Sequence, residues 1–253
     1  MSWVALKTGS VALKNPILIE GLPGIGNVGK VTADFIIDQC KGKKIFEFRG
    51  TSIPHSVFVN EKHLVELPRI ELFAIPHKPR DVLVLAGDVQ PLSEESCYEF
   101  CELVLKICRD LDCSEVIALG GIGLKQIPKN PKLYCTGTDK KVVQDFVKKT
   151  GVSNKLYGVV GPIVGVSGVI VGLASRYQSN AVAFLAETYG HPMYLGVKGA
   201  RELLKVLDKM LKLKLTLKDL DTDIAELEEE MLTRGTDALP RFKKIKGETS
   251  YIG

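Results

Sequence analysis

The amino-acid sequence predicts an α/β fold in which a mostly parallel sheet is covered by helices on both faces. Short apolar segments alternate along the chain with amphipathic segments of helical periodicity, which is typical of parallel strands joined by helices. One segment, Val82–Ala86, is continuously apolar, as buried central strands are. A glycine-rich turn, Gly21–Gly29, joins a short buried strand to a helix. These three features together predict the fold class.

The individual elements follow from local patterns. Ser93 precedes an apolar-periodic segment with Glu94 and Glu95 in its first turn, which predicts an N-cap and a helix that runs to about Leu111. The predicted helices are Gly26–Gln39, Glu94–Leu111, Asp139–Lys149 and Val166–Tyr177. The predicted strands are Ile17–Glu20, Lys44–Phe48, Ser56–Val59, Glu71–Ile75, Val82–Ala86, Val116–Leu119, Tyr157–Val160 and Asn180–Ala186. The glycines of Gly120–Gly123 are expected to end the strand before them.

Composition excludes several classes of protein. The 253 residues carry a net charge of only +4, and no stretch of arginine with aromatic residues indicates a nucleic-acid surface. No segment reaches the ~20 apolar residues of a membrane span, and the N-terminus lacks the apolar core of a signal peptide. We therefore expect a cytoplasmic protein that binds neither nucleic acid nor membranes.

The six cysteines are expected to be reduced and buried. Cys97, Cys101 and Cys108 fall on one face of a predicted helix, and the chain has no CxxC or HxxxH pair. Zinc sites need close pairs of ligands, whereas unmodified cysteine packs as a small hydrophobic residue. The sequence therefore predicts no metal site.

The C-terminal third departs from the α/β pattern. We expect a core domain over residues 1–198, a helical arm over 199–233 and a flexible tail over 234–253, because apolar residues recur at three-four spacing through the arm. This seam consists of Leu203, Val206, Met210, Leu213, Leu217, Leu220, Ile224, Leu227 and Met231. A seam of this kind favours association within or between chains. The alternatives are a helix that packs on its own sheet, or two helices with a break between Thr216 and Asp223.

The glycine turn has two interpretations. Gly24, Gly26 and Gly29 match the G-x-G-x-x-G pattern of dinucleotide sites, and Glu47 lies roughly where a ribose-binding acid is expected. This alternative makes the protein a nucleotide- or anion-binding enzyme. Against it, Pro23 places a donor-free residue in the turn, and no catalytic residues accompany the pattern. The other interpretation is a tight strand–helix junction that needs no cofactor.

Two glycine signatures resemble those of the proteasome assembly chaperone 2 family. The first is GLPGIGNVG at residues 21–29, followed by Ala33, Asp34 and Ile37; the second is the segment 158–190, which contains AVAFLAET at 181–188. The resemblance covers about residues 10–210. It implies a three-layer, nucleoside-phosphorylase-like fold without established catalytic residues, acting as a homo-oligomeric scaffold in proteasome assembly.

The resemblance also implies partners. Some relatives end in a hydrophobic-Tyr-any tripeptide that inserts between proteasome α subunits, whereas this chain ends Ser250-Tyr251-Ile252-Gly253. The tyrosine is thereby displaced by about 3.3 Å of extended chain from that pattern. The expected partners are a second copy of the chain and either proteasome α subunits or another assembly factor. The expected partner-binding residues are Leu213, Leu217, Leu220, Ile224, Leu227, Met231, Tyr251, Ile252 and Gly253.

Overall fold

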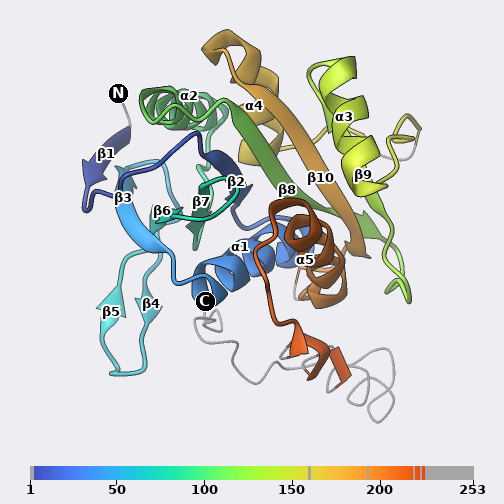
Figure 1. The fold of residues 1–253 in the computed structure, drawn as a ribbon. Coiled ribbons are helices and arrows are strands. Elements are labelled where there is room, and N and C mark those ends of the chain that lie inside the picture. The colour runs from blue at the N-terminus through green and yellow to red at the C-terminus, as the bar shows by residue number, and fades with distance from the viewer. Residues whose placement is uncertain (1–2, 159–160, 193, 219, 223, 226–253) are drawn as a thin grey trace.

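A computed structural model describes residues 3–158, 161–192, 194–218, 220–222 and 224–225. Figure 1 shows a twisted sheet between two layers of helices, with a small two-stranded ribbon that extends away from it. The strands of the sheet are β1 (Trp3–Lys7), β2 (Ile17–Gly21), β3 (Lys43–Gly50), β6 (Ile70–Ile75), β7 (Val82–Gly87), β8 (Glu115–Leu124), β9 (Leu133–Gly137) and β10 (Asn180–Tyr189). The ribbon consists of β4 (Phe58–Val59) and β5 (Val65–Glu66). The α-helices are α1 (Val28–Gln39), α2 (Glu94–Asp110), α3 (Lys140–Thr150), α4 (Val166–Leu173) and α5 (Val197–Leu211), with 3₁₀ turns η1 (Ile25–Asn27) and η2 (Ala174–Tyr177).

The sheet is mixed. Its strand order is β1-β3-β6-β7-β2-β8-β10-β9. The pairs among β7, β2, β8 and β10 are parallel, and the remaining pairs are antiparallel. The α/β class with helices on both faces is confirmed, but the sheet is not mostly parallel. No helix lies between β3 and β6 or between β6 and β7, and strands joined without a crossover pair antiparallel.

Two hydrophobic cores lie on opposite faces of the sheet. Residues of α2 and α4 form one core with alternate residues of the strands, such as Leu18 and Leu83. Residues of α1, α3 and α5 form the other core with the intervening residues, such as Ile19 and Val84. The central strand β7 is buried on both faces, as its continuous apolar run predicted.

The starts of α2 and α3 were predicted correctly, whereas α1 begins at Val28, two residues after the predicted Gly26. The Ser93 side chain accepts a hydrogen bond from the Ser96 N–H (3.2 Å), and Asp139 caps α3 through the Val142 N–H (2.9 Å). The cysteines are free; Cys40 is half-buried and the other five are buried, as expected. Across the part of the chain that the structure describes, no helix is both long and apolar enough to cross a membrane.

Several strand predictions need correction. Gly120–Gly123 continues β8 instead of ending it, because its backbone stays paired with β10. Tyr157 and Gly158 form a turn, not the start of a strand; residues 159–160 lie outside the described residues. The segment predicted as Ser56–Val59 contains only the two-residue strand β4, which lies in the separate ribbon.

The predicted arm, residues 199–233, is not one continuous helix within the described residues. Helix α5 ends at Leu211, and Lys212 and Lys214 adopt left-handed φ values of 57° and 61°. Leu213 and Leu220 then return to the core that α5 shares with α1. Burying these two leucines in their own domain is favourable, whereas a continuing helix would leave them in water. The chain does break after α5, but the non-helical residues are 212–217, and helical residues resume at Lys218, inside the range Thr216–Asp223 that was predicted as the break.

Candidate functional site

The glycine turn links β2 to α1 at the carboxyl edge of the parallel strands. Gly26 and Asn27 adopt left-handed φ values of 61° and 49°, and α1 begins at the next residue. The carbonyl of Gly26 accepts a hydrogen bond from the Gly196 N–H at 2.7 Å, so the turn is attached to the start of α5. Left-handed backbone is readily adopted by glycine, which accounts for the residue type at position 26.

Close packing around the turn accounts for two of its glycines. A Cβ at Gly29 would lie 2.7 Å from the carbonyl oxygen of Leu119, and a Cβ at Gly26 would lie 2.6 Å from Oγ1 of Thr188. Both glycines are buried, whereas Gly24 is exposed. The glycines thus bring α1 against β8 and β10, as the junction interpretation requires.

The structure does not bring Glu47 to the glycine turn. In the sheet order, β6 and β7 separate its strand β3 from β2, and neighbouring strands lie about 4.8 Å apart. Glu47 instead pairs with Arg49 (2.8 Å) and Lys44 (3.5 Å). The four residues of the dinucleotide interpretation therefore do not form one site.

Beneath the turn lies a buried carboxylate that the sequence analysis did not single out. Glu20 is inaccessible to solvent; its Oε1 accepts a hydrogen bond from the Leu22 N–H at 2.9 Å. Its Oε2 has no hydrogen-bond partner among the described residues. Burial raises the pKa of this carboxyl to about 7. The available signal was an acidic residue at the end of an otherwise apolar strand.

Gln90 connects the loops at this carboxyl edge. Its Nε2 donates to the carbonyl of Pro23 in the glycine turn, and its Oε1 accepts from the Val166 N–H at 2.9 Å at the start of α4. Nearby, the Leu92 N–H donates to the Ser52 carbonyl at 3.0 Å, which attaches the loop after β7 to the segment before the ribbon. In open α/β sheets, ligands usually bind at the carboxyl edge.

Several aliphatic side chains are exposed along this edge, beside charged ones such as Glu94 and Lys125. Ile25 follows β2, Leu92 follows β7 and Val164 precedes α4, and each is more than half exposed. The ribbon adds Val57, Val59, Leu64, Val65 and Leu67. Within the described ranges, no three His, Cys, Asp or Glu side chains gather as metal ligands. We call this set of aliphatic residues the apolar edge; its chemistry suits contact with another protein surface.

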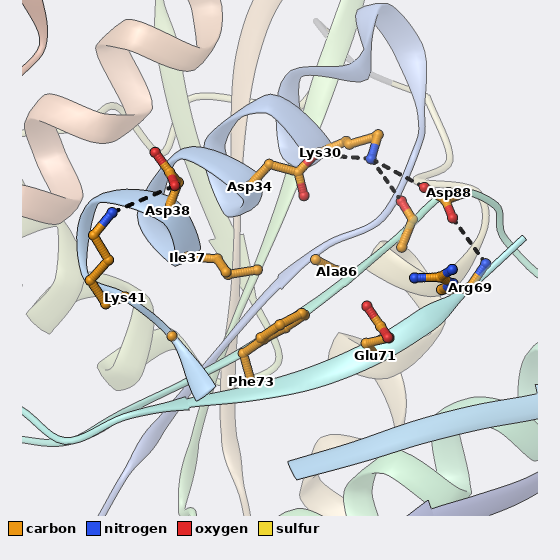
Figure 2. A pocket seen from close by; sticks show the side chains of 12 residues that line it. Lys30, Asp34, Ile37, Asp38, Lys41, Arg69, Glu71, Phe73, Ala86 and Asp88 are labelled. Carbon is orange, nitrogen blue, oxygen red and sulfur yellow. Dashed lines mark hydrogen bonds and ion pairs between the residues drawn. The ribbon is translucent and has the colours of Figure 1, made fainter. Parts of the chain in front are cut away.

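A second feature is an open cleft of about 460 Å³ between α1 and strands β6 and β7 (Figure 2). Ile37 and Phe73 contribute apolar surface to it. Lys30 Nζ pairs with Asp34 at 2.9 Å and with Asp88 at 3.8 Å across its end. The cleft is lined by three basic side chains and four acidic ones, so its charges nearly compensate one another: Lys30, Lys41 and Arg69, and Asp34, Asp38, Glu71 and Asp88.

The predicted partner-binding residues fall into three groups: buried, half-buried and outside the described residues. Leu213 and Leu220 are buried in their own domain, so they are not available to a partner. Leu217 and Ile224 are half-buried against the same core. Leu227, Met231, Tyr251, Ile252 and Gly253 lie outside the described residues.

The fold and the edge define the class of protein: an α/β domain with helices on both faces of its sheet, a packed glycine turn and exposed aliphatic side chains at the carboxyl edge. The chain belongs to the PAC2 family, whose sequence model matches residues 18–233. It is 28% identical over 251 residues to the uncharacterised protein MJ1210 of Methanocaldococcus jannaschii, covering 95% of this chain and 93% of that protein.

Solved structures share this fold. PbaB of Pyrococcus furiosus, described as an archaeal proteasome activator, is 25% identical with a TM-score of 0.83, over 92% of this chain and 98% of PbaB. PbaA of the same organism, described as an archaeal homolog of proteasome-assembly chaperone, is 23% identical with a TM-score of 0.75, over 94% and 92% of the two chains. At that lower identity, the likeness to PbaA establishes the fold alone.

Proposed function

We propose that this protein is a non-enzymatic chaperone or adaptor in proteasome assembly, acting in the cytoplasm as a homo-oligomeric scaffold. The observation that carries the proposal is the similarity to PbaB, the archaeal proteasome activator, over nearly the full length of both chains. Family membership over residues 18–233 supports the same role.

The apolar edge supports a role in protein binding. Enzymes gather titratable and polar groups where the substrate binds, and such groups carry shifted pKa values. Two carboxyl groups in the described residues have raised pKa values: Glu20 is sealed beneath the edge, and Asp34, in the cleft beside α1, is paired with Lys30. The exposed surface above Glu20 presents aliphatic side chains such as Ile25 and Val164, and covering them with a partner is favourable.

The C-terminal tail supplies a second candidate contact. Tyr251 provides the kind of aromatic anchor that a docking tail needs. We propose proteasome α subunits as the partner. Because the tyrosine is displaced from its position in the relatives' motif, the tail and the apolar edge must be tested separately as sites of contact with α subunits.

The test is native mass spectrometry of the purified full chain mixed with purified proteasome α subunits from the same organism. The expected result is a complex of defined stoichiometry. Tyr251→Ala and Ile25→Glu then distinguish the two contacts, since the variant that weakens the complex identifies the surface used. Lys140→Ala is the control, because the exposed Lys140 starts α3 just after Gly137, which pairs with Val182 near the start of β10 and so lies at the opposite edge of the sheet. If none of these mixtures contains a complex, the proposal is refuted.

A further inference from the structure

The β4–β5 ribbon has its apolar side facing outward. Val59 pairs with Val65 and Phe58 with Glu66, so the two valines share one face of the ribbon. Exposure alternates along both strands: residues 57, 59, 65 and 67 are exposed, whereas 56, 58, 66 and 68 are less so. The outer face therefore carries Val57, Val59, Val65 and Leu67, which are 51%, 55%, 69% and 69% exposed. An antiparallel sheet in water normally shows the opposite pattern, with its polar side outward.

The inner side of the ribbon is held by polar contacts. Glu66 accepts a hydrogen bond from Asn60 Nδ2 at 2.7 Å and pairs with Arg69 at 2.6 Å. The Arg69 N–H donates to Asp88 at 3.0 Å, which connects the ribbon to the end of β7. The Asn60 side chain also accepts hydrogen bonds from the N–H groups of Lys62 and Leu64, which closes the turn. These contacts hold the apolar face outward.

Nothing in the described part of the chain covers this face. Neither hydrophobic core includes any of its four side chains. Figure 1 shows the ribbon extending from the ends of β3 and β6, away from the helical layers. A two-stranded ribbon alone is at most marginally stable in water. A partner that covers the apolar face would supply the missing stabilisation.

The charges of the ribbon favour a second copy of the same chain as that partner. Residues 55–69 contain two acidic residues, Glu61 and Glu66, and two basic residues, Lys62 and Arg69, so this segment is neutral while its histidines are neutral. The whole chain carries +4. A patch that meets its own copy suffers like-charge repulsion unless its charges balance. The ribbon meets that condition, and it carries no excess charge that would select an acidic or basic partner.

We propose that the outer face of the β4–β5 ribbon is the self-association surface of this protein. Two copies pack ribbon against ribbon about a two-fold axis, so that the valines of one face meet those of the other. Leu92, attached to Ser52 near the base of the ribbon, extends the apolar contact toward the roughly 800 Å² per partner typical of stable interfaces. This inference rests on the proposed function only for the homo-oligomeric state. It makes the β4–β5 ribbon, instead of the heptad seam, the surface through which two copies associate.

Sedimentation velocity of the full chain tests the inference without any proteasome component. Val59→Glu is the test substitution, and Val4→Glu on β1 is the matched control, because both valines lie in strands and are 55% exposed. The wild-type chain is expected to self-associate. Val59→Glu should raise the dissociation constant by about 100-fold, since each substitution occurs twice in a two-fold interface, whereas Val4→Glu should leave it within about threefold.

A second measurement guards against a variant that misfolds. Hydrogen exchange of the wild-type chain should show slower exchange of the Val59 and Val65 amides at high than at low protein concentration. The inference is overturned if the wild-type chain remains monomeric at every concentration, or if folded Val59→Glu associates like the wild type. It is also overturned if Val59→Glu abolishes binding to α subunits while self-association persists, because the ribbon would then serve a different partner. Loss of self-association with retained α-subunit binding supports it.

Discussion

The Oε1 atom of Gln90 accepts a hydrogen bond from the Val166 N–H at 2.9 Å, and this contact joins the loop after β7 to the first turn of α4. Residues 76 positions apart in the sequence thereby meet at the carboxyl edge. Since Gln90 also bonds to Pro23, one side chain sets the relative position of three loops.

Gln90→Ala should therefore destabilise the protein. It leaves the Val166 N–H and the Pro23 carbonyl without their partner, and each unsatisfied group costs about 1–3 kcal/mol, less where water enters. We expect a loss of about 2 kcal/mol in urea unfolding. Gln144→Ala, at an exposed position of α3, is the control and should change stability by less than about 0.5 kcal/mol. Equal effects of the two substitutions would contradict the bridging role of Gln90.

Gly26→Ala tests whether the glycine turn is a packed junction. The backbone at residue 26 has positive φ, and the new Cβ would meet Thr188, so we expect a loss of at least about 2 kcal/mol in thermal or urea unfolding. Gly172→Ala is the matched control, because a Cβ there meets nothing within 4 Å in helix α4. That change should stabilise the protein by up to about 1 kcal/mol. In calorimetric titration, saturable binding of NAD or ATP to the wild type that Gly26→Val abolishes without unfolding would favour the cofactor interpretation instead.

Glu20 should make stability depend on pH. The pKa of this carboxyl is raised from 4.5 to about 7 by burial, so the folded state holds the proton more tightly than the unfolded state does. The stabilisation of the folded state by the protonated Glu20 carboxyl is therefore fully present below about pH 4.5. It is lost as the pH rises through about 7. The loss by pH 8 is on the order of 3 kcal/mol.

Urea unfolding of the wild type and of Glu20→Gln between pH 4 and 8 measures this effect. The stability of the wild type relative to the variant should fall as the pH rises. Glu47→Gln is a control of opposite sign, because Arg49 lowers the pKa of the Glu47 carboxyl in the folded state. A constant difference between wild type and Glu20→Gln across the range would show that the pKa of Glu20 does not change on folding.

Leu220→Ala distinguishes a core residue from a seam residue of an arm. Leu220 is 2% exposed in the core shared by α1 and α5, so truncation should cost about 2–4 kcal/mol of unfolding free energy. Leu217→Ala, at a half-buried neighbouring position, should cost less. Neither should change the sedimentation coefficient of the folded protein. A change in oligomeric state without a loss of stability would restore the heptad arm as an interface.

Predictions from sequence succeeded where the determining interactions are local. The Ser93 cap, the continuous apolar run of β7 and the turn at Gly26 each depend on neighbouring residues, and each was placed correctly. The edge strands β1 and β9 were missed because their pairing partners, such as Gly50 for Trp3 and Ala186 for Leu133, are distant in sequence. Short edge strands carry little periodicity of their own.

The end of α5 and the location of Glu47 could not be predicted for the same reason: both depend on contacts between residues distant in sequence. Three-four spacing continues through Leu213 and Leu220, and only the tertiary contact with the α1 layer shows that the chain turns back at Lys212. Similarly, Glu47 lies at the right sequence distance from the glycine turn, but β6 and β7 lie between their strands. Spacing along the chain did not reveal the strand order, which decides whether these residues meet.

The proposed function requires that this PAC2-family protein promotes proteasome assembly by binding α subunits. The most direct test is the rate at which complete proteasomes form from separately purified α and β subunits, followed by native gel electrophoresis with and without the full chain. We expect faster formation in its presence, saturating as the chain approaches the amount of α subunit. Unchanged formation at every amount of the chain, together with no complex with α subunits, would contradict the claim.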